Sequence, residues 1–411
     1  MPILLEEDLQ RPLPRMYRVR QQFDETRLKD VAGTVRAELA KPEIRALVKP
    51  GMRIAVGVGS RGIQNLYTIV ETTVNSLKEL GAEPFIVSAM GSHGGGTEEG
   101  QREVLAGYGI TEERLGVPVV TTVDTVYLGN CANGRPVWFY RAAYEADLIV
   151  PINRVKLHTD FVGPIQSGLC KMLVIGLGNH KGCSAVHEEA PEVFADAIEE
   201  TARLILQKAP VGFGIAILEN AYDKTYAVEA VPAEHLVERE KELVQIAKGN
   251  MPYIMLDEAD VIVCGAIGKD ISGAGFDPNI LGRSSVLKQF VLHIPRYQRL
   301  VLCDVTPASH GNGIGVGLFD VITKKVAEQL DLESMYANAI ACNCLGDASV
   351  PCTVDDEETA IRVALKCCRN IDRDHPRIIR IQNTLHLGEI EVSEALLDAV
   401  RADSRMSLIE N

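Results

Sequence analysis

Three histidines and one lysine in the first half of the chain are the side chains best suited to chemistry. His93 lies in a Gly-Ser-His-Gly-Gly-Gly segment, and His158, Lys171 and His187 follow along the chain. An imidazole titrates near neutral pH, so it can transfer protons or bind a metal ion. Lysine is almost never fully buried unless it is paired or used covalently, yet Lys171 stands in the apolar, glycine-containing run 168–178. These residues indicate acid–base or metal chemistry beside a nucleophilic amine, and the simpler alternative is a set of turn, core and surface side chains.

Glycine-rich segments follow two of the apolar runs and suit the binding of an anion. The first, 57–62, reads Gly-Val-Gly-Ser-Arg-Gly and matches the dinucleotide-binding fingerprint. That fingerprint also needs an acidic residue at the end of the next strand, where Ser92 and His93 stand instead. We therefore expect a tight strand-to-helix turn in which Arg61 binds an anion. The glycines after His93 let the backbone approach a ligand and form an anion nest.

Apolar strands that alternate with amphipathic helices must position these side chains. This alternation, with glycine-rich turns at the strand ends, indicates an α/β fold with mainly parallel sheets. Ligands of such sheets bind at the carboxyl ends of the strands, which is where His93 and the segment 57–62 fall. The predicted strands include 53–58, 84–89, 147–151, 214–218, 259–264 and 299–305, and the predicted helices include 66–80, 234–248 and 284–292.

The length of 411 residues is enough for two domains. We expect one α/β domain over 1–255 and a second over 256–376, with an active-site cleft between them. The boundary is set where the helix 234–248 ends and a new apolar strand begins. The last segment, 377–411, has the pattern of a strand followed by a helix, and its return to the first domain is left open.

Composition and charge exclude several classes of protein. The formal net charge of −14 argues against a general affinity for nucleic acid or an anionic membrane, whereas local arginines still allow a small anionic substrate. No apolar run is long enough to span a bilayer, and the N-terminus lacks the pattern of a signal peptide. The ten cysteines have no framework-like spacing, so reduced thiols in a cytoplasmic protein are the simplest interpretation.

The stretch 155–187 resembles the core motif of the lactate racemase family, the enzymes that use a nickel-pincer nucleotide. In that motif a histidine precedes a lysine that carries the cofactor, and a further histidine follows sixteen positions later, as Lys171 and His187 are spaced here. The resemblance covers 52–187, and it extends thinly to 273–280. It implies that the cofactor, pyridinium-3-thioamide-5-thiocarboxylic acid mononucleotide with nickel, is covalently attached at Lys171 and that His187 binds the metal. It also implies a catalytic role for His93 and His158.

The resemblance further implies that the N-terminal domain is a cofactor-binding domain, with contributions from Ser60, Arg61, Gly94 and Gly95. The implied enzyme is an isomerase that racemises or epimerises a 2-hydroxy acid by proton-coupled hydride transfer. Its implied partners are the small anionic substrate and the cofactor-synthesis proteins, and a homo-oligomer is compatible with the sequence.

The substrate pocket departs from that of lactate racemase. The glutamine and lysine that face the substrate in that enzyme fall at Gly282 and Ser285 here, so we expect a substrate other than lactate. Arg283 is a candidate replacement for the lost cation, and His310 is a candidate to line the site from the second domain.

Two alternatives remain beside the isomerase. His180-x-x-Cys183-x-x-x-His187 has the spacing of ligands on one helical face, which would fit a zinc-dependent hydrolase. A protein that only carries the nickel nucleotide, without catalysis, would need Lys171 and His187 but no acid–base pair. The cysteines of the second half match no iron–sulfur motif, and we expect them to be core thiols.

Overall fold

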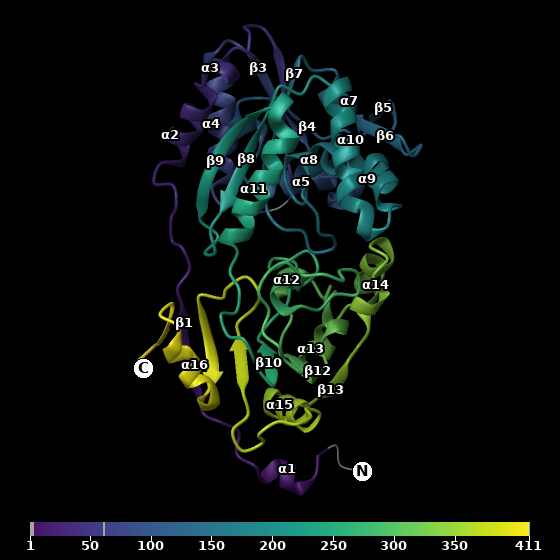
Figure 1. Ribbon diagram of the computed structural model, residues 1–411. Coiled ribbons are helices and arrows are strands. Elements are labelled where there is room, and N and C mark those ends of the chain that lie inside the picture. The colour runs from purple at the N-terminus through teal and green to yellow at the C-terminus, as the bar shows by residue number, and fades with distance from the viewer. Residues whose placement is uncertain (1–3, 61, 411) are drawn as a thin grey trace. The chain divides into compact units, whose positions relative to one another are not determined.

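The computed structural model describes residues 4–60 and 62–410, and the chain forms two compact units (Figure 1). The first, called here the N-terminal unit, is Glu25–Met251. The second, the C-terminal unit, combines Met1–Asp24 with Pro252–Asn411. No helix in the described part of the chain is long and apolar enough to cross a membrane.

The N-terminal unit is built on a six-stranded sheet in the order β4-β3-β2-β7-β8-β9. All neighbours in this sheet are parallel except β9, which runs antiparallel to β8. A separate antiparallel hairpin, β5–β6, lies beside it. The strands are β2 (Arg53–Val58), β3 (Glu83–Ser88), β4 (Val119–Val120), β5 (Thr125–Asn130), β6 (Pro136–Tyr140), β7 (Leu148–Arg154), β8 (Phe213–Glu219) and β9 (Thr225–Pro232).

Helices cover both faces of this sheet, as Figure 1 shows. Alternate residues of β2 and β8, such as Val56 and Ile215, join the core beneath α4, whose apolar residues recur at helical spacing. On the opposite face of the sheet, Leu177 packs against Gly57 and Leu169 packs against Gly214. The helices are α2 (Val31–Leu39), α3 (Pro42–Arg45), α4 (Leu66–Glu79), α5 (Glu98–Gly107), α6 (Glu112–Leu115), α7 (Arg141–Tyr144), α8 (Leu169–Lys171), α9 (Asn179–His187), α10 (Phe194–Lys208) and α11 (Leu236–Asn250).

The C-terminal unit has an eight-stranded sheet in the order β13-β12-β11-β10-β14-β15-β1-β16. The strands from β13 to β14 are parallel, and the remaining pairs are antiparallel. Its strands are β10 (Val261–Cys264), β11 (Arg299–Leu302), β12 (Val321–Thr323), β13 (Cys352–Val354), β14 (Ile378–Ile381), β15 (Glu389–Ser393), β1 (Met16–Gln21) and β16 (Met406–Leu408). Its helices are α1 (Glu6–Gln10), α12 (Pro278–Leu281), α13 (Lys324–Gln329), α14 (Leu332–Ala341), α15 (Glu357–Lys366) and α16 (Leu397–Ala402).

The two chain ends belong to the C-terminal unit, which corrects the expected domain limits. The segment 377–411 does not return to the first domain, because β14 pairs with β10 and continues the same sheet. The first 24 residues also lie outside the N-terminal unit, since β1 is inserted between β15 and β16. The buried side chain of Gln21 fixes this strand by donating to Leu387 O (2.7 Å) and accepting from Met255 N (2.7 Å). The expected boundary at 255 lies close to the one in the structure, and the cleft between the domains stays a prediction.

Candidate active site

The candidate residues of the N-terminal unit follow the carboxyl ends of its parallel strands. Ser60 comes after β2, His93 after β3 and His158 after β7. These three strands are adjacent in the sheet, in the order β3-β2-β7. Carboxyl ends of parallel strands meet at one edge, where α/β folds bind their ligands. The fold therefore collects the candidate histidines at one edge, as the sequence predicts.

The loops after β2 and β3 are joined by hydrogen bonds. Ser60 Oγ contacts His93 Nδ1, and Tyr108 donates its hydroxyl to Ser60 O (3.0 Å). The fully buried amide of Gln101 donates to Gly91 O (3.2 Å) and to His93 O (3.4 Å). Because Nδ1 of His93 is held by the serine, the Nε2 atom of this exposed ring is directed away from that contact.

The glycines after His93 have backbone conformations that other residues rarely adopt. Gly94, Gly95 and Gly96 have φ angles of 65°, 66° and 65°. A Cβ atom on Gly94 would lie 2.6 Å from Gln101 N, so this glycine is required by the approach of α5. A Cβ atom on Gly95 would meet nothing within 4 Å, which leaves an open stretch of backbone beside His93.

His158 and Lys171 are brought together directly. Lys171 Nζ lies 2.5 Å from His158 Nε2. The other ring nitrogen, Nδ1, accepts the backbone N–H of Asp160 (3.0 Å), so the neutral ring carries its proton on Nε2. The backbone N–H of His158 donates to the buried Gln166 Oε1 (2.7 Å), which fixes the loop. This contact places the Lys171 amine directly against the ring nitrogen.

Lys171 stands where the helical geometry changes. It is the last residue of α8, and the segment Met172–Gly176 continues as a π-helix. Single π-helical turns within helices occur frequently at functional sites. Asn153, at the end of β7, donates its side-chain N–H to Gly168 O (2.8 Å), so the start of α8 is tied to the sheet edge.

His187 ends α9 and has one ring nitrogen already bonded. Its Nδ1 lies 2.7 Å from Cys183 O and 3.5 Å from Cys183 Sγ, one helical turn earlier. The carbonyl can only accept, so Nδ1 carries the proton and Nε2 keeps the lone pair that a metal ion requires. The residue is exposed, which leaves Nε2 accessible.

The thiol and the imidazole of this turn shift each other's protonation. Desolvation lowers the pKa of His187, but the hydrogen bond and negative charge of Cys183 outweigh it and raise the pKa. Desolvation raises the pKa of Cys183, but the contacts with His187 and Ser92 outweigh it and lower the pKa. The charge of Lys171 also lowers the pKa of His187, as expected of groups in one site.

Two phenylalanines connect the histidines that the sequence singled out. The ring of Phe161 stacks on His158 with centroids 4.2 Å apart, and Phe194 follows at 4.9 Å from Phe161. Phe194 in turn meets the His187 ring edge-on at 5.2 Å. One cluster thus contains His158, Lys171 and His187, and the rings of the two phenylalanines pack against the two histidines. Sequence reasoning missed both phenylalanines; Phe161 lies three residues after His158, whereas Phe194 carried no local signal.

Residues 11–196 match the family described as lactate racemase N-terminal domain. The chain therefore resembles the lactate racemase family over 186 of its 411 residues. Its fold is similar to that of the lactate racemase apoprotein from Thermoanaerobacterium thermosaccharolyticum, with a TM-score of 0.53 and 13% identity over 89% of this chain and 93% of that one. A structural genomics protein from Thermotoga maritima is also similar, with a TM-score of 0.44 and 14% identity over 57% of this chain and 63% of that one. No curated protein matches the chain by sequence.

Neither the expected anion-binding arginine nor the zinc alternative has a described site in the structure. Arg61, the expected anion-binding residue, lies outside the described residues. The zinc alternative places His180, Cys183 and His187 on one helical face, but no group of three His, Cys, Asp or Glu side chains in the described part of the chain could hold a metal ion. All ten cysteines are described, and none forms a disulfide.

Two candidate residues, Arg283 and His310, lie in the C-terminal unit. Arg283 forms an ion pair with Asp320 (2.6 Å), donates to Leu318 O (2.9 Å) and lies over the ring of Tyr297. Its charge is therefore already matched within its own unit. His310 has a φ of 47° and ends a single 3-10 turn, Pro307–Ser309.

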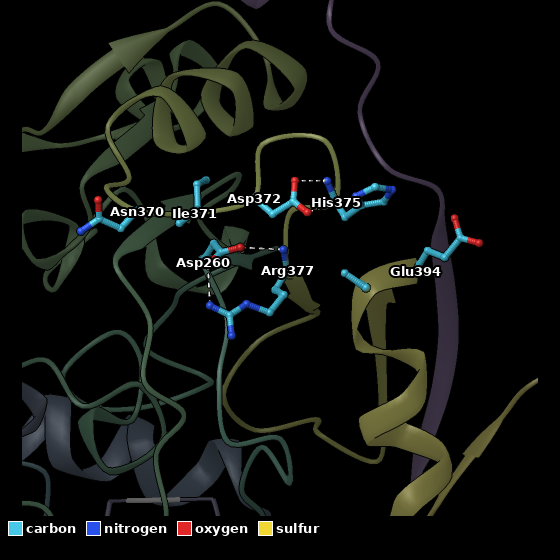
Figure 2. A pocket seen from close by; sticks show the side chains of 8 residues that line it. Asp260, Asn370, Ile371, Asp372, His375, Arg377 and Glu394 are labelled. Carbon is cyan, nitrogen blue, oxygen red and sulfur yellow. Dashed lines mark hydrogen bonds and ion pairs between the residues drawn. The ribbon is translucent and has the colours of Figure 1, made fainter.

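A cavity of about 610 Å³ in the C-terminal unit contains none of the predicted site residues (Figure 2). Asp260 and Arg377, which form an ion pair at 2.9 Å in this cavity, directly precede β10 and β14. The cavity therefore lies at the amino-terminal edge of the parallel strands, opposite to the edge that binds ligands in α/β folds. We assign the candidate site to the N-terminal unit.

Proposed function

We propose that this protein is a member of the lactate racemase family and a nickel-pincer-nucleotide-dependent racemase or epimerase of a 2-hydroxy acid. The observation that carries the proposal is the contact between Lys171 and His158, with His187 in the same aromatic cluster. One amine, one acid–base imidazole and one metal-binding imidazole are the groups that such a reaction needs.

The residues present fit the proposed cofactor. Lys171 offers an amine for covalent attachment, and His187 offers an unshared Nε2 for nickel. Nickel(II) accepts imidazole and sulfur ligands in a planar arrangement. Asn179 lies eight residues from Lys171 and eight from His187, and its buried side-chain amide has no hydrogen-bond partner in the part of the chain that the structure describes. A buried amide without a partner is costly, so Asn179 favours a further polar group at this place.

The bound nucleotide would supply a hydride acceptor, and the protein would handle the proton. His93 and His158 are the proposed acid–base pair for the substrate hydroxyl: one would accept the hydroxyl proton as the C–H bond breaks, and the other would donate a proton to the ketone oxygen after the intermediate has rotated. Ser60 Oγ contacts Nδ1 of His93, so we assign this task to Nε2. In the cofactor-free protein His158 Nε2 contacts Lys171 instead, and covalent use of the amine would release His158 for the substrate.

The substrate carboxylate requires a cation, and we assign this role to Arg61. Ser60, Gly94 and Gly95 would contact the cofactor from the loops at the same sheet edge. Arg283 is a weaker candidate because Asp320 already neutralises it. We further propose that the protein works in the cytoplasm with the proteins that synthesise the cofactor.

The test uses single-enantiomer 2-hydroxy acids that carry deuterium at C2. The full chain is produced together with the cofactor-making enzymes, and the products are analysed by chiral chromatography and mass spectrometry. We expect a pure enantiomer to become a mixture that retains deuterium at C2, because hydride transfer returns the same hydrogen. Loss of deuterium to water would contradict the proposed mechanism.

A non-catalytic carrier of the nucleotide is separated by two variants. H93N and H158N remove the proposed acid–base groups and leave Lys171 and His187 in place. We expect both variants to bind nickel and to lose isomerisation. If the wild-type chain takes up nickel and converts no member of a broad hydroxy-acid panel, the carrier is the better account.

A further inference from the structure

The short helix that carries Lys171 has no cap of its own. Its N-cap residue is Gly168, which has no side chain to accept the first backbone N–H groups. A carboxylate from another helix takes this role: Glu240, on α11, accepts the N–H of Cys170 at 2.8 Å through Oε2.

Glu240 and the turn beneath Lys171 are in direct contact. Glu240 is fully buried, with no exposed surface. A Cβ atom on Gly168 would lie 2.5 Å from the Glu240 carboxyl carbon, so only glycine allows this approach. The start of α8 is thus held between Glu240 on one side and the Asn153 amide, which bonds Gly168 O, on the other.

A buried acid at this place is not explained by stability. Glu240 Oε1 has no hydrogen-bond partner among the described residues, so part of the carboxyl group is desolvated without compensation. Burial raises the pKa of Glu240 to about 7, against the opposing effect of the N–H groups of Cys170 and Leu169. An apolar residue of similar volume would avoid this cost. A costly buried group that touches the turn of the proposed attachment lysine points to a role in that site.

We propose that Glu240 is the positioning residue of the attachment lysine. By accepting the N–H of Cys170, its carboxyl group fixes the turn that places Lys171 Nζ against His158 Nε2. The inference rests on the proposed function for the role of Lys171. The geometry of the turn itself is independent of any cofactor.

The test measures the reactivity of Lys171 in the full-length, cofactor-free protein. Lysines are labelled with limiting acetic anhydride at a fixed pH, and each site is quantified by peptide mass spectrometry. Wild type is compared with E240A and E240Q, and E242Q serves as the matched control because Glu242 lies on α11 but contacts Arg239 at the surface. Lys181 and Lys248 serve as internal controls on α9 and α11.

We expect E240A to change the labelling rate of Lys171 by at least about fivefold and to leave Lys181 and Lys248 unchanged. E240Q should change the labelling rate of Lys171 by about twofold, since the amide oxygen can still accept one N–H. E242Q should match wild type. A Lys171 rate in E240A equal to that of wild type would overturn the inference, as would a uniform change at all lysines with the fold intact.

If E240A does not fold, E240Q decides alone, because it preserves the shape of the side chain. A wild-type Lys171 rate in E240Q would then overturn the inference. If the wild-type chain does not attach the cofactor, the proposed function is contradicted. The labelling experiment uses cofactor-free protein, so its result still tests whether Glu240 positions Lys171.

Discussion

At the residue scale, the two ring nitrogens of each key histidine have different partners, and this difference sets their roles. His187 Nδ1 bonds to Cys183 O in its own helix, so Nε2 is the atom left for a metal. His158 Nδ1 accepts from Asp160 N, so Nε2 is the donor to Lys171. Under the proposed function, the same side chain type would therefore bind a metal at His187 and transfer a proton at His158.

The assignment of His187 leads to a prediction about nickel content. In a chain produced with the cofactor-making enzymes, H187A should retain the mass increase at Lys171 and lose most of its nickel, because the tether remains and the protein ligand is removed. H180A is the matched control, since His180 is an exposed histidine of the same helix. Nickel is measured by plasma mass spectrometry. Equal nickel loss in H180A and H187A would count against the assignment.

The buried carboxyl group of Glu240 predicts a dependence of stability on pH. Its pKa is raised to about 7 in the folded protein, above the unfolded value of about 4.3, so the folded state binds more protons between these values. Stability should therefore fall as pH rises through this window. Relative to E240Q, wild type should lose about 2–3 kcal/mol of unfolding free energy between pH 5 and pH 8. Urea unfolding at both pH values measures this, and parallel behaviour of the two proteins would refute it.

At the element scale, the sequence predicts isolated strands and helices well and local turns poorly. The expected strand 53–58 is β2, and the expected helix 66–80 is α4. The strand has a continuous apolar run and the helix has a clear helical periodicity. The apolar side chains of both pack in the core, as these patterns predict. The expected helix 284–292 does not form. Ser284 Oγ instead accepts the N–H groups of Val286 (3.1 Å) and Leu287 (2.8 Å), a local turn that competes with a helix.

The candidate site was predictable only where its residues are close in sequence. His158, Lys171 and His187 fall in one motif, and the structure brings His158 and Lys171 into contact. Glu240 could not be found, because a single glutamate in a charged helix has the pattern of a solvated face. Its burial depends on the packing of α11 against α8, which no local periodicity contains.

The close approach of α8 and α11 predicts the effect of an alanine at Gly168. The added Cβ would lie 2.5 Å from the Glu240 carboxyl carbon, so G168A should lower the unfolding free energy by about 1–3 kcal/mol. G107A is the control, because a Cβ at this helical glycine of α5 meets nothing within 4 Å. It should be neutral or stabilising by up to about 1 kcal/mol. Chemical unfolding curves compare the two, and equal stabilities would contradict the packing.

At the scale of the whole molecule, the chain ends determine how the C-terminal unit is completed. The strand β1 lies between β15 and β16, far away in sequence, and its Gln21 side chain is fully buried. Sequence reasoning placed these residues in the first domain because chain order is the simplest guide. The pairing of antiparallel strands that are distant in sequence does not affect local composition. The position of β1 in this sheet could therefore be found only from the structure.

This arrangement predicts what removal of the first 24 residues does. Without β1, the strand β15 loses one of its two neighbours, while the sheet of the N-terminal unit is untouched. The exchange rate of the backbone amide hydrogens should therefore increase by at least about tenfold in Glu389–Ser393 and stay unchanged in Arg53–Val58. A variant with intact length and the exposed Arg18 and Arg20 replaced by lysine serves as the control. Full protection of β15 in the shortened chain would contradict the sheet order.

The central claim is that Lys171 is the covalent anchor of the nucleotide. The most direct measurement is the mass of the chain after production with the cofactor-making enzymes, followed by peptide mapping. We expect a mass increase that maps to the peptide with Lys171 in wild type and is absent in K171A, with K181A modified like wild type. An unmodified Lys171, under conditions in which a known lactate racemase becomes modified, would contradict the claim.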